Sequence, residues 1–127
     1  MGSGTELGRV RGLGSAREGT HHWWHQRLTA AANLVLMTWF FVSLARLPGL
    51  EYGVVHQWMS SAWVAIPMAL LVISVFYHAR LGLQVLVEDY VHDEKHIVCM
   101  VALNAFALGG AAIAVFSILK IAFGAFA

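Results

Sequence analysis

The sequence has few charged residues. Asp, Glu, Lys and Arg together make up only 12% of its 127 residues, and the formal net charge is +1. A water-soluble domain of this size carries about 25% charged residues. The shortage therefore argues against a soluble globular protein. The small net charge also gives no indication of a nucleic acid or an acidic substrate as a binding partner.

Cysteine is nearly absent. The single cysteine, Cys99, cannot form an intramolecular disulfide, and no CxxCH motif is present that would attach haem covalently. The sequence also lacks the glycine pattern of a dinucleotide-binding fold and the cysteine clusters of a ferredoxin. We therefore expect this chain to carry neither a flavin nor an iron–sulfur cluster itself.

What the sequence does contain is three long apolar runs, at about residues 28–45, 61–87 and 97–119. Each is long enough to cross a bilayer as a helix, which needs about 20 residues. Isolated strands would leave backbone groups unpaired in lipid, so helices are expected. The sequence thus predicts an all-α membrane protein, with a three-helix transmembrane domain at residues 21–127 after a mobile N-terminal segment at residues 1–20.

Two stretches around the second run contain helix-breaking residues. Residues 46–60 include Pro48, Gly49 and Gly53, which predicts a loop or a short surface helix. Pro67 is expected in the first turns of the second span, where a missing backbone N–H costs little.

Arginines dominate the charge before the first span and predict the orientation of the chain. Arg9, Arg11, Arg17 and Arg27 precede or border this span, which places the N-terminus in the cytoplasm and the loop at residues 88–96 on the same side. The first apolar run exceeds the 7–15 residues typical of the apolar region of a signal peptide, so we expect it to be retained. The absence of an obvious Ser-rich, acidic-poor transit segment favours a bacterial inner membrane over the mitochondrial inner membrane.

His78 is the strongest functional candidate because it follows a long uncharged run and an ionisable group within a span is costly. On a helix Gly82, Val85 and Asp89 fall within about 40° of His78. Neutral imidazole is a common axial ligand of haem iron, and Gly82 would let a flat macrocycle approach the backbone. A histidine hydrogen bonded to a neighbouring helix explains His78 equally well, so the residues alone leave both interpretations open.

Other polar residues have simpler explanations. Arg80 lies off this stripe and is expected to extend to the headgroups or to pair with an acid. Tyr90 fits an interfacial aromatic anchor. His21 and His25 are spaced i, i+4 and could share a metal, but no third ligand follows at a suitable spacing. We favour an interfacial belt for residues 21–27.

Five residues of the second run nevertheless form a specific pattern, H-x3-G-x-Q-x4-D-Y. It resembles the second-helix signature of the hydrophobic membrane-anchor subunits of succinate dehydrogenase, the smaller anchors of respiratory complex II. Weaker matches precede it: an early LGR tripeptide, and a histidine six residues before an arginine that is followed by LTA. The resemblance covers essentially the whole chain. Its residues are His78, Gly82, Gln84, Asp89 and Tyr90, then Leu7-Gly8-Arg9, and His21 with Arg27-Leu28-Thr29-Ala30.

This resemblance implies an anchor of succinate:quinone oxidoreductase that is not catalytic alone. It implies a flavoprotein subunit with FAD, an iron–sulfur subunit with the clusters, and a second membrane-anchor subunit of the cytochrome b556 type. The two anchors would share haem b, and electrons would pass from succinate to ubiquinone. We also expect the second anchor to stabilise His78, Arg80 and Asp89, which three helices alone would leave without enough partners in lipid.

The resemblance also implies roles for individual residues. His78 is the axial ligand of the haem iron, Gly82 packs against the haem, and Arg27 lies near a haem propionate or a lipid headgroup. Tyr90 donates a hydrogen bond to a ubiquinone carbonyl, with Asp89 beside it. The alternatives are the anchor of a fumarate reductase or of another quinone-linked oxidoreductase, and a structural or assembly membrane protein without redox function.

Overall fold

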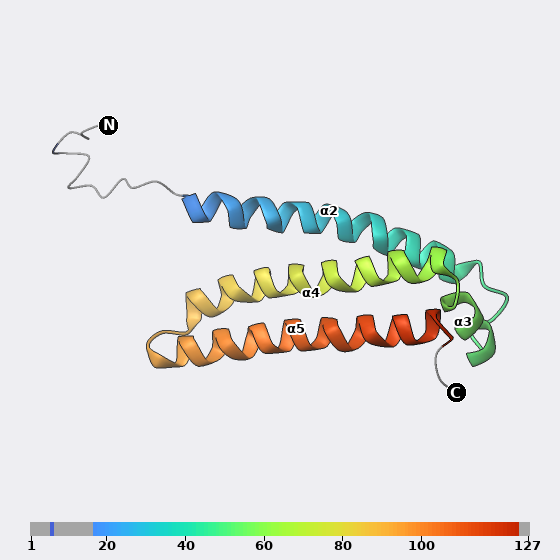
Figure 1. The fold of residues 1–127 in the computed structure, drawn as a ribbon. Coiled ribbons are helices and arrows are strands. Elements are labelled where there is room, and N and C mark those ends of the chain that lie inside the picture. The colour runs from blue at the N-terminus through green and yellow to red at the C-terminus, as the bar shows by residue number, and fades with distance from the viewer. Residues whose placement is uncertain (1–5, 7–16, 125–127) are drawn as a thin grey trace.

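The computed structural model describes Glu6 and residues 17–124, and Figure 1 shows their arrangement. Four helices follow one another: α2 (Arg17–Ala45), α3 (Tyr52–Met59), α4 (Ala62–Tyr90) and α5 (Glu94–Ala122). The described residues include no strand. The prediction of an all-α fold is therefore confirmed.

The three long helices contain the three predicted spans. Each includes a stretch of 27 or 29 residues that is long and apolar enough to cross a membrane. The helices extend beyond the apolar runs, most of all α2, which begins at Arg17 rather than near Leu28. Most of the predicted N-terminal segment, residues 1–20, lies outside the described residues, whereas residues 17–20 form the first turn of α2.

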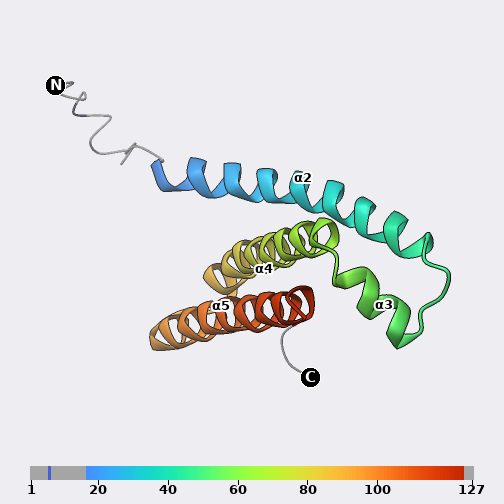
Figure 2. The same ribbon diagram turned by 45° about the vertical axis from the view of Figure 1, so that its right-hand side comes forward.

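Helix α4 lies between the other two long helices. It packs against α2 on one side and α5 on the other, and the short helix α3 contacts α4 and α5. Within residues 17–124, the backbones of α2 and α5 do not come within 8 Å of each other at any pair of Cα atoms. Figures 1 and 2 show α2 crossing α4 at an angle while α4 and α5 run side by side. Helix α4 is therefore the helix that links α2 to α5.

The buried core is small and lies at the end of the bundle near α3. Four buried side chains form its centre, and residues of α2 and α3 pack around them. Most of the remaining apolar side chains face outwards; Trp63 is 88% exposed and Leu34 is 71% exposed. An apolar surface this extensive suits lipid rather than water. The core residues are Ala65, Met68 and Leu71 of α4 with Ile118 of α5, packed against Leu36, Phe40 and Trp58 among others.

The segments around α4 differ in detail from the sequence prediction. Residues 46–60 include the short helix α3, one of the two predicted forms. Pro67 is the sixth residue of α4, so it lies beyond the first turn. It removes the hydrogen bond that the carbonyl of Trp63 would otherwise accept from the residue four positions on. Pro67 therefore lies in the first turns of α4, as predicted, whereas the low cost expected of its missing N–H stays a prediction.

The turn between α4 and α5 is shorter than predicted. It consists of residues 91–93, because Tyr90 ends α4 and Glu94 begins α5. Asp93 has φ 63° and ψ −150°, and it is the only non-glycine residue with positive φ among the described residues. A side chain in this conformation is uncommon and strained. This turn holds α4 and α5 antiparallel, as Figure 1 shows.

Candidate functional site

His78 lies at the contact between α4 and α2. Its imidazole is half-buried, and Nδ1 is 3.0 Å from the hydroxyl oxygen of Thr29. The other ring nitrogen, Nε2, has no hydrogen-bond partner among the described residues. The hydrogen bond to a neighbouring helix, one of the two interpretations of His78, is present and still leaves one nitrogen for a ligand.

The antiparallel register of α2 and α4 explains this contact. Gln26 lies next to Gly82, and about one turn further along α2 Thr29 contacts His78. The same register brings Asn33 to the level of Ser74. The α2 residues His22, Gln26, Thr29 and Asn33 have the spacing i, i+4, i+7 and i+11, which places them on one helix face. We call the side chains of His22, Gln26, Thr29, Asn33, Ser74 and His78 the polar seam.

Several atoms of the polar seam are buried without a partner. They are His22 Nε2, Gln26 Oε1, Asn33 Oδ1 and Ser74 Oγ. Each such group costs about 1–3 kcal/mol when it stays unsatisfied. Further along the same interface, towards α3, Leu36 and Phe40 pack against the apolar core instead. The polar half of the interface is thus confined to the end of the bundle that carries the α4–α5 turn.

An open cavity of about 490 Å³ lies beside the polar seam. It brings together Arg27 and Gly82, two of the predicted site residues, although they are 55 positions apart in the chain. The guanidinium of Arg27 lies 4.6 Å from the centre of the Trp23 ring. A β-carbon at Gly82 would lie 3.5 Å from Gln26 Nε2, an ordinary contact, so α2 itself does not require a glycine there. The cavity is lined by His22, Trp23, Gln26, Arg27, Gly82 and Val85.

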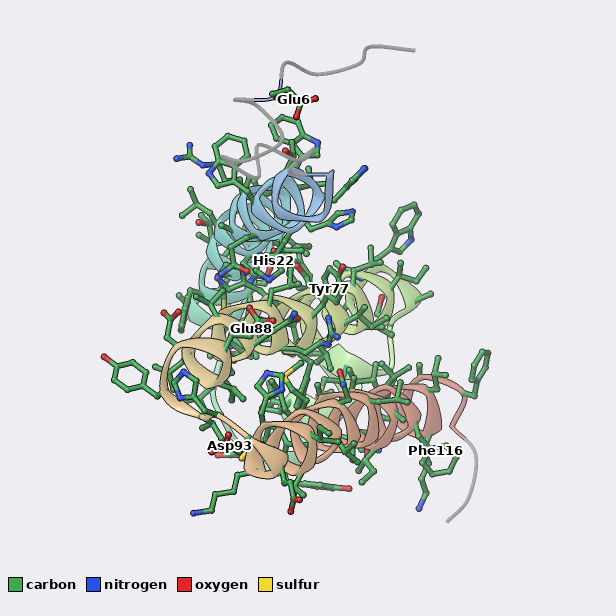
Figure 3. The ribbon with its side chains drawn as sticks, turned by 90° about the vertical axis from the view of Figure 1, so that its left-hand side faces the viewer. Glu6, His22, Tyr77, Glu88, Asp93 and Phe116 are labelled. Carbon is green, nitrogen blue, oxygen red and sulfur yellow. The ribbon has the colours of Figure 1, made fainter. Side chains whose placement is uncertain are left out.

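Figure 3 views the molecule from this end of the bundle. His22 lies between α2 and α4, while Glu88 marks the last turns of α4 and Asp93 the turn to α5. The polar groups of the cavity therefore lie on the side of α4 that faces α2.

Asp89 and Tyr90 lie apart from this cavity. They are the last two residues of α4, both are exposed, and Tyr90 is 79% exposed. Because α4 is continuous from His78 to Tyr90, these residues are separated by about 18 Å along the helix axis. Gln84 of the sequence signature donates a 2.8 Å hydrogen bond to Glu88, one turn on. The predicted site residues thus form two groups, one at the α2–α4 contact and one at the helix end.

Arg80 has a partner within the chain. Its Nε donates a 2.7 Å hydrogen bond to Oδ1 of Asn104 on α5, beside a separate cavity of about 400 Å³. We expected His78 and Arg80 to lack sufficient partners without a second subunit. Each has one hydrogen-bond partner on another helix, Thr29 and Asn104 respectively, but the other guanidinium N–H groups of Arg80 and Nε2 of His78 make no hydrogen bond with the described residues, so the expectation stays a prediction.

The described residues contain no group of three or more His, Cys, Asp or Glu side chains placed to hold a metal ion. The rings of His21 and His25 are 6.4 Å apart between centroids. Any iron bound at His78 would therefore need its remaining ligands from outside the described part of this chain.

Sequence analysis selected His78, Gly82, Arg27, Asp89 and Tyr90 but missed the α2 side of the seam. The signal was present in the regular spacing of polar residues 22, 26, 29 and 33 along one face of an otherwise apolar helix.

The fold is that of a multi-pass membrane protein, with three long apolar helices and a polar contact at one end. Residues 1–119 match the family described as succinate dehydrogenase/fumarate reductase transmembrane subunit. The chain belongs to this family, and the resemblance carried by the second-helix pattern is confirmed.

Curated relatives agree with the family match. The chain is 30% identical over 116 residues to the succinate dehydrogenase hydrophobic membrane anchor subunit of Paracoccus denitrificans, covering 91% of this chain and 90% of that one. It is 31% identical over 90 residues to the protein of the same name from Rickettsia bellii, covering 71% and 72%. A Rickettsia conorii protein of that name is 25% identical over 111 residues, covering 80% and 88%. These likenesses support a role as a membrane anchor subunit.

Proposed function

We propose that this chain is the smaller membrane anchor of a succinate:quinone oxidoreductase. It tethers a flavoprotein subunit, which carries FAD, and an iron–sulfur subunit to the membrane. A second anchor subunit of the cytochrome b556 type packs beside it, and electrons from succinate reach ubiquinone at the membrane surface. Relatives named as succinate dehydrogenase anchors support this proposal.

The residues at the α2–α4 contact fit haem b. Nε2 of His78 has no hydrogen-bond partner among the described residues, and Nδ1 is already bonded to Thr29. Neutral imidazole with its other nitrogen held by a second group is the usual form of an iron ligand. The chain supplies one such ligand, so a histidine of the second anchor completes the pair. Haem b, when bound, supplies a one-electron redox centre within the membrane.

The cavity beside the polar seam fits the propionate side of the same haem. Arg27 is the cation on its wall, and Nε2 of His22 is a buried atom without a partner that can donate when it carries a hydrogen. A carboxylate such as a haem propionate would pair with the arginine and accept a hydrogen bond from a donor there. Gly82 leaves the backbone of α4 open on this wall. A lipid headgroup offers Arg27 the same chemistry.

Asp89 and Tyr90 are suited to the quinone. Both are exposed at the end of α4, where a quinone headgroup at the membrane surface could reach them. The phenol of Tyr90 donates a hydrogen bond to a quinone carbonyl, and this bond strengthens as the oxygen gains charge on reduction. Asp89 lies beside it as an acceptor for protons or water.

The charge pattern supports an N-terminus on the cytoplasmic side of a bacterial inner membrane. In that orientation the polar seam and the α4–α5 turn lie at the cytoplasmic end. Both the haem ligand and the quinone-binding residues would then be on the side where the soluble subunits deliver electrons.

The single observation that carries this proposal is that His78, in a chain of this family, has Nδ1 bonded to Thr29 and no partner at Nε2 among the described residues. The test is a dithionite-reduced minus oxidised spectrum of the purified complex, with its subunits identified by mass. His78→Ala should abolish or shift the low-spin haem signal, whereas His56→Ala, on the short helix α3, should preserve it. An unchanged spectrum in the His78 variant would contradict the haem assignment.

The same preparation tests the alternatives. Succinate-driven quinone reduction and quinol-driven fumarate reduction, measured side by side, distinguish a succinate dehydrogenase anchor from that of a fumarate reductase. A preparation without haem and without copurifying redox subunits would instead indicate a structural or assembly protein.

A further inference from the structure

The hydroxyl of Thr29 has three polar neighbours. Its oxygen is 2.8 Å from the carbonyl oxygen of His25, 3.1 Å from that of Gln26 and 3.0 Å from Nδ1 of His78. A hydroxyl has one proton to donate and two lone pairs that accept. Backbone carbonyls only accept, so both carbonyl contacts require the proton of Thr29.

Because the hydroxyl has only one proton for three neighbours, the contacts determine which ring nitrogen of His78 carries the hydrogen. If the Thr29 proton points at the carbonyls, a lone pair faces His78, and Nδ1 must carry a hydrogen to complete the contact. In the opposite arrangement the Thr29 hydroxyl donates its hydrogen to Nδ1, and both carbonyl contacts are lost. It also puts the ring hydrogen on Nε2, where no described acceptor lies within reach. The first arrangement makes more hydrogen bonds in a medium without water to replace them.

We propose that Thr29 is a positioning residue that holds His78 in the tautomer with hydrogen on Nδ1, leaving the Nε2 lone pair free for iron. This inference rests on the proposed function, because it concerns the haem ligand. The bond from the Thr29 hydroxyl to the preceding turn fixes the oxygen that receives the Nδ1 hydrogen. An acceptor at Nδ1 orients the ring and makes the coordinating nitrogen more basic.

The test compares variants of the intact complex. Thr29→Val removes the hydroxyl at nearly constant shape, and Thr29→Ser keeps the hydroxyl. Thr38→Val is the matched control, because Thr38 makes the same bond to the preceding turn, 2.7 Å to the carbonyl of Leu34, but is exposed and has no histidine neighbour. The measurements are haem retained after dilution, the haem midpoint potential, and the largest g value of the ferric haem in its electron paramagnetic resonance spectrum.

Thr29→Val should lower haem affinity about 10–100-fold, the usual effect of losing such a group. The midpoint potential should rise, since a less electron-rich imidazole stabilises ferric iron less. A tenfold change in the ferric-to-ferrous affinity ratio corresponds to about 59 mV. The largest g value should shift as well. Thr29→Ser should remain close to the wild type, and Thr38→Val should match it in all three measurements. If the valine variant does not assemble, Thr29→Ala removes the same hydroxyl with a smaller side chain and provides the same comparison.

Two results would overturn the inference while leaving the proposed function intact. One is a Thr29→Val or Thr29→Ala complex with wild-type haem affinity, potential and g values. The other is a Thr29→Ser complex that is shifted as far as the valine variant. A wild-type complex without haem, or one whose spectrum survives His78→Ala, overturns the proposed haem site and this inference together, so the two failures can be told apart.

Discussion

Gly110 of α5 packs directly against the ring of Phe76 on α4. A β-carbon at position 110 would lie 2.5 Å from Cε1 of this ring and 2.8 Å from Cζ, closer than real side-chain atoms approach. The preceding glycine, Gly109, has nothing within 4 Å of the equivalent position. Two adjacent glycines thus differ completely in what surrounds them, and only one allows α4 and α5 to approach closely.

We predict opposite effects for alanine at these two glycines. Gly110→Ala should destabilise the α4–α5 pair by about 1–3 kcal/mol, because the ring of Phe76 must move. Gly109→Ala should be neutral or stabilise α5 by up to about 1 kcal/mol, because alanine favours a helix more than glycine does. Thermal unfolding of the purified complex in detergent measures both. Equal stability of the two variants would contradict the packing seen here.

Tyr90→Phe should reduce quinone-dependent turnover about tenfold or more, since loss of about 1.4 kcal/mol of transition-state stabilisation is a factor of ten. The substitution removes only the hydroxyl and keeps the ring. Electron transfer from succinate to an artificial acceptor upstream of the membrane should be unchanged, which serves as the internal control. If the variant reduces ubiquinone at the wild-type rate with wild-type inhibitor sensitivity, Tyr90 is only an interfacial anchor.

Asp93→Gly should stabilise the turn between α4 and α5. Asp93 has φ 63°, a conformation that costs a residue with a side chain about 1–3 kcal/mol and that glycine adopts freely. His92→Gly, one residue earlier in the same turn, should be neutral or destabilising because His92 does not have a positive φ. The unfolding temperatures of the two variants give the comparison. A lower unfolding temperature for Asp93→Gly than for His92→Gly would count against strain at Asp93.

Expressed without a second anchor subunit, the chain should be degraded or should aggregate. Hydrogen bonds within the chain satisfy His78 Nδ1 and Arg80 Nε, but the cavity beside Arg27 still contains unpaired buried atoms of His22 and Gln26. Unpaired polar groups in lipid cost several kcal/mol. Co-expression with the partner subunits is the control. Recovery of a stable, monodisperse monomer in detergent would show that the chain needs no partner.

The sequence predicted the three long helices because apolar runs of this length have one stable form in a membrane. It did not predict where they end. Helix α2 continues back to Arg17, since the polar and aromatic residues before Leu28 remain helical although they add little hydropathy. Glu88, Asp89 and Tyr90 likewise belong to α4 rather than to a loop. Composition identifies the part of a helix in lipid, whereas its ends depend on caps and turns.

The sequence singled out His78 because an ionisable residue inside an apolar run is conspicuous on its own. Thr29 could not be found in the same way. A threonine in an apolar helix is unremarkable until its partner is known, and His78 is 49 positions away on another helix. That pairing depends on the register between α2 and α4, which is set by packing along their whole length. The role of Arg80 was missed for the same reason, because Asn104 lies on α5.

The polar seam has a consequence for the biosynthesis of the chain. Thr29 is synthesised 49 residues before His78, which at about 5–20 residues per second is a delay of roughly 2–10 s. The Thr29 hydroxyl keeps its bond within α2 during this interval. However, α2 then has no α4 to cover Gln26 and Asn33, and lipid offers these side chains no hydrogen bonds. Release of α2 into the bilayer by itself would expose them both. The hairpin of α2 and α4, rather than the single helix, is therefore the smallest unit that can leave the translocation channel with these groups covered.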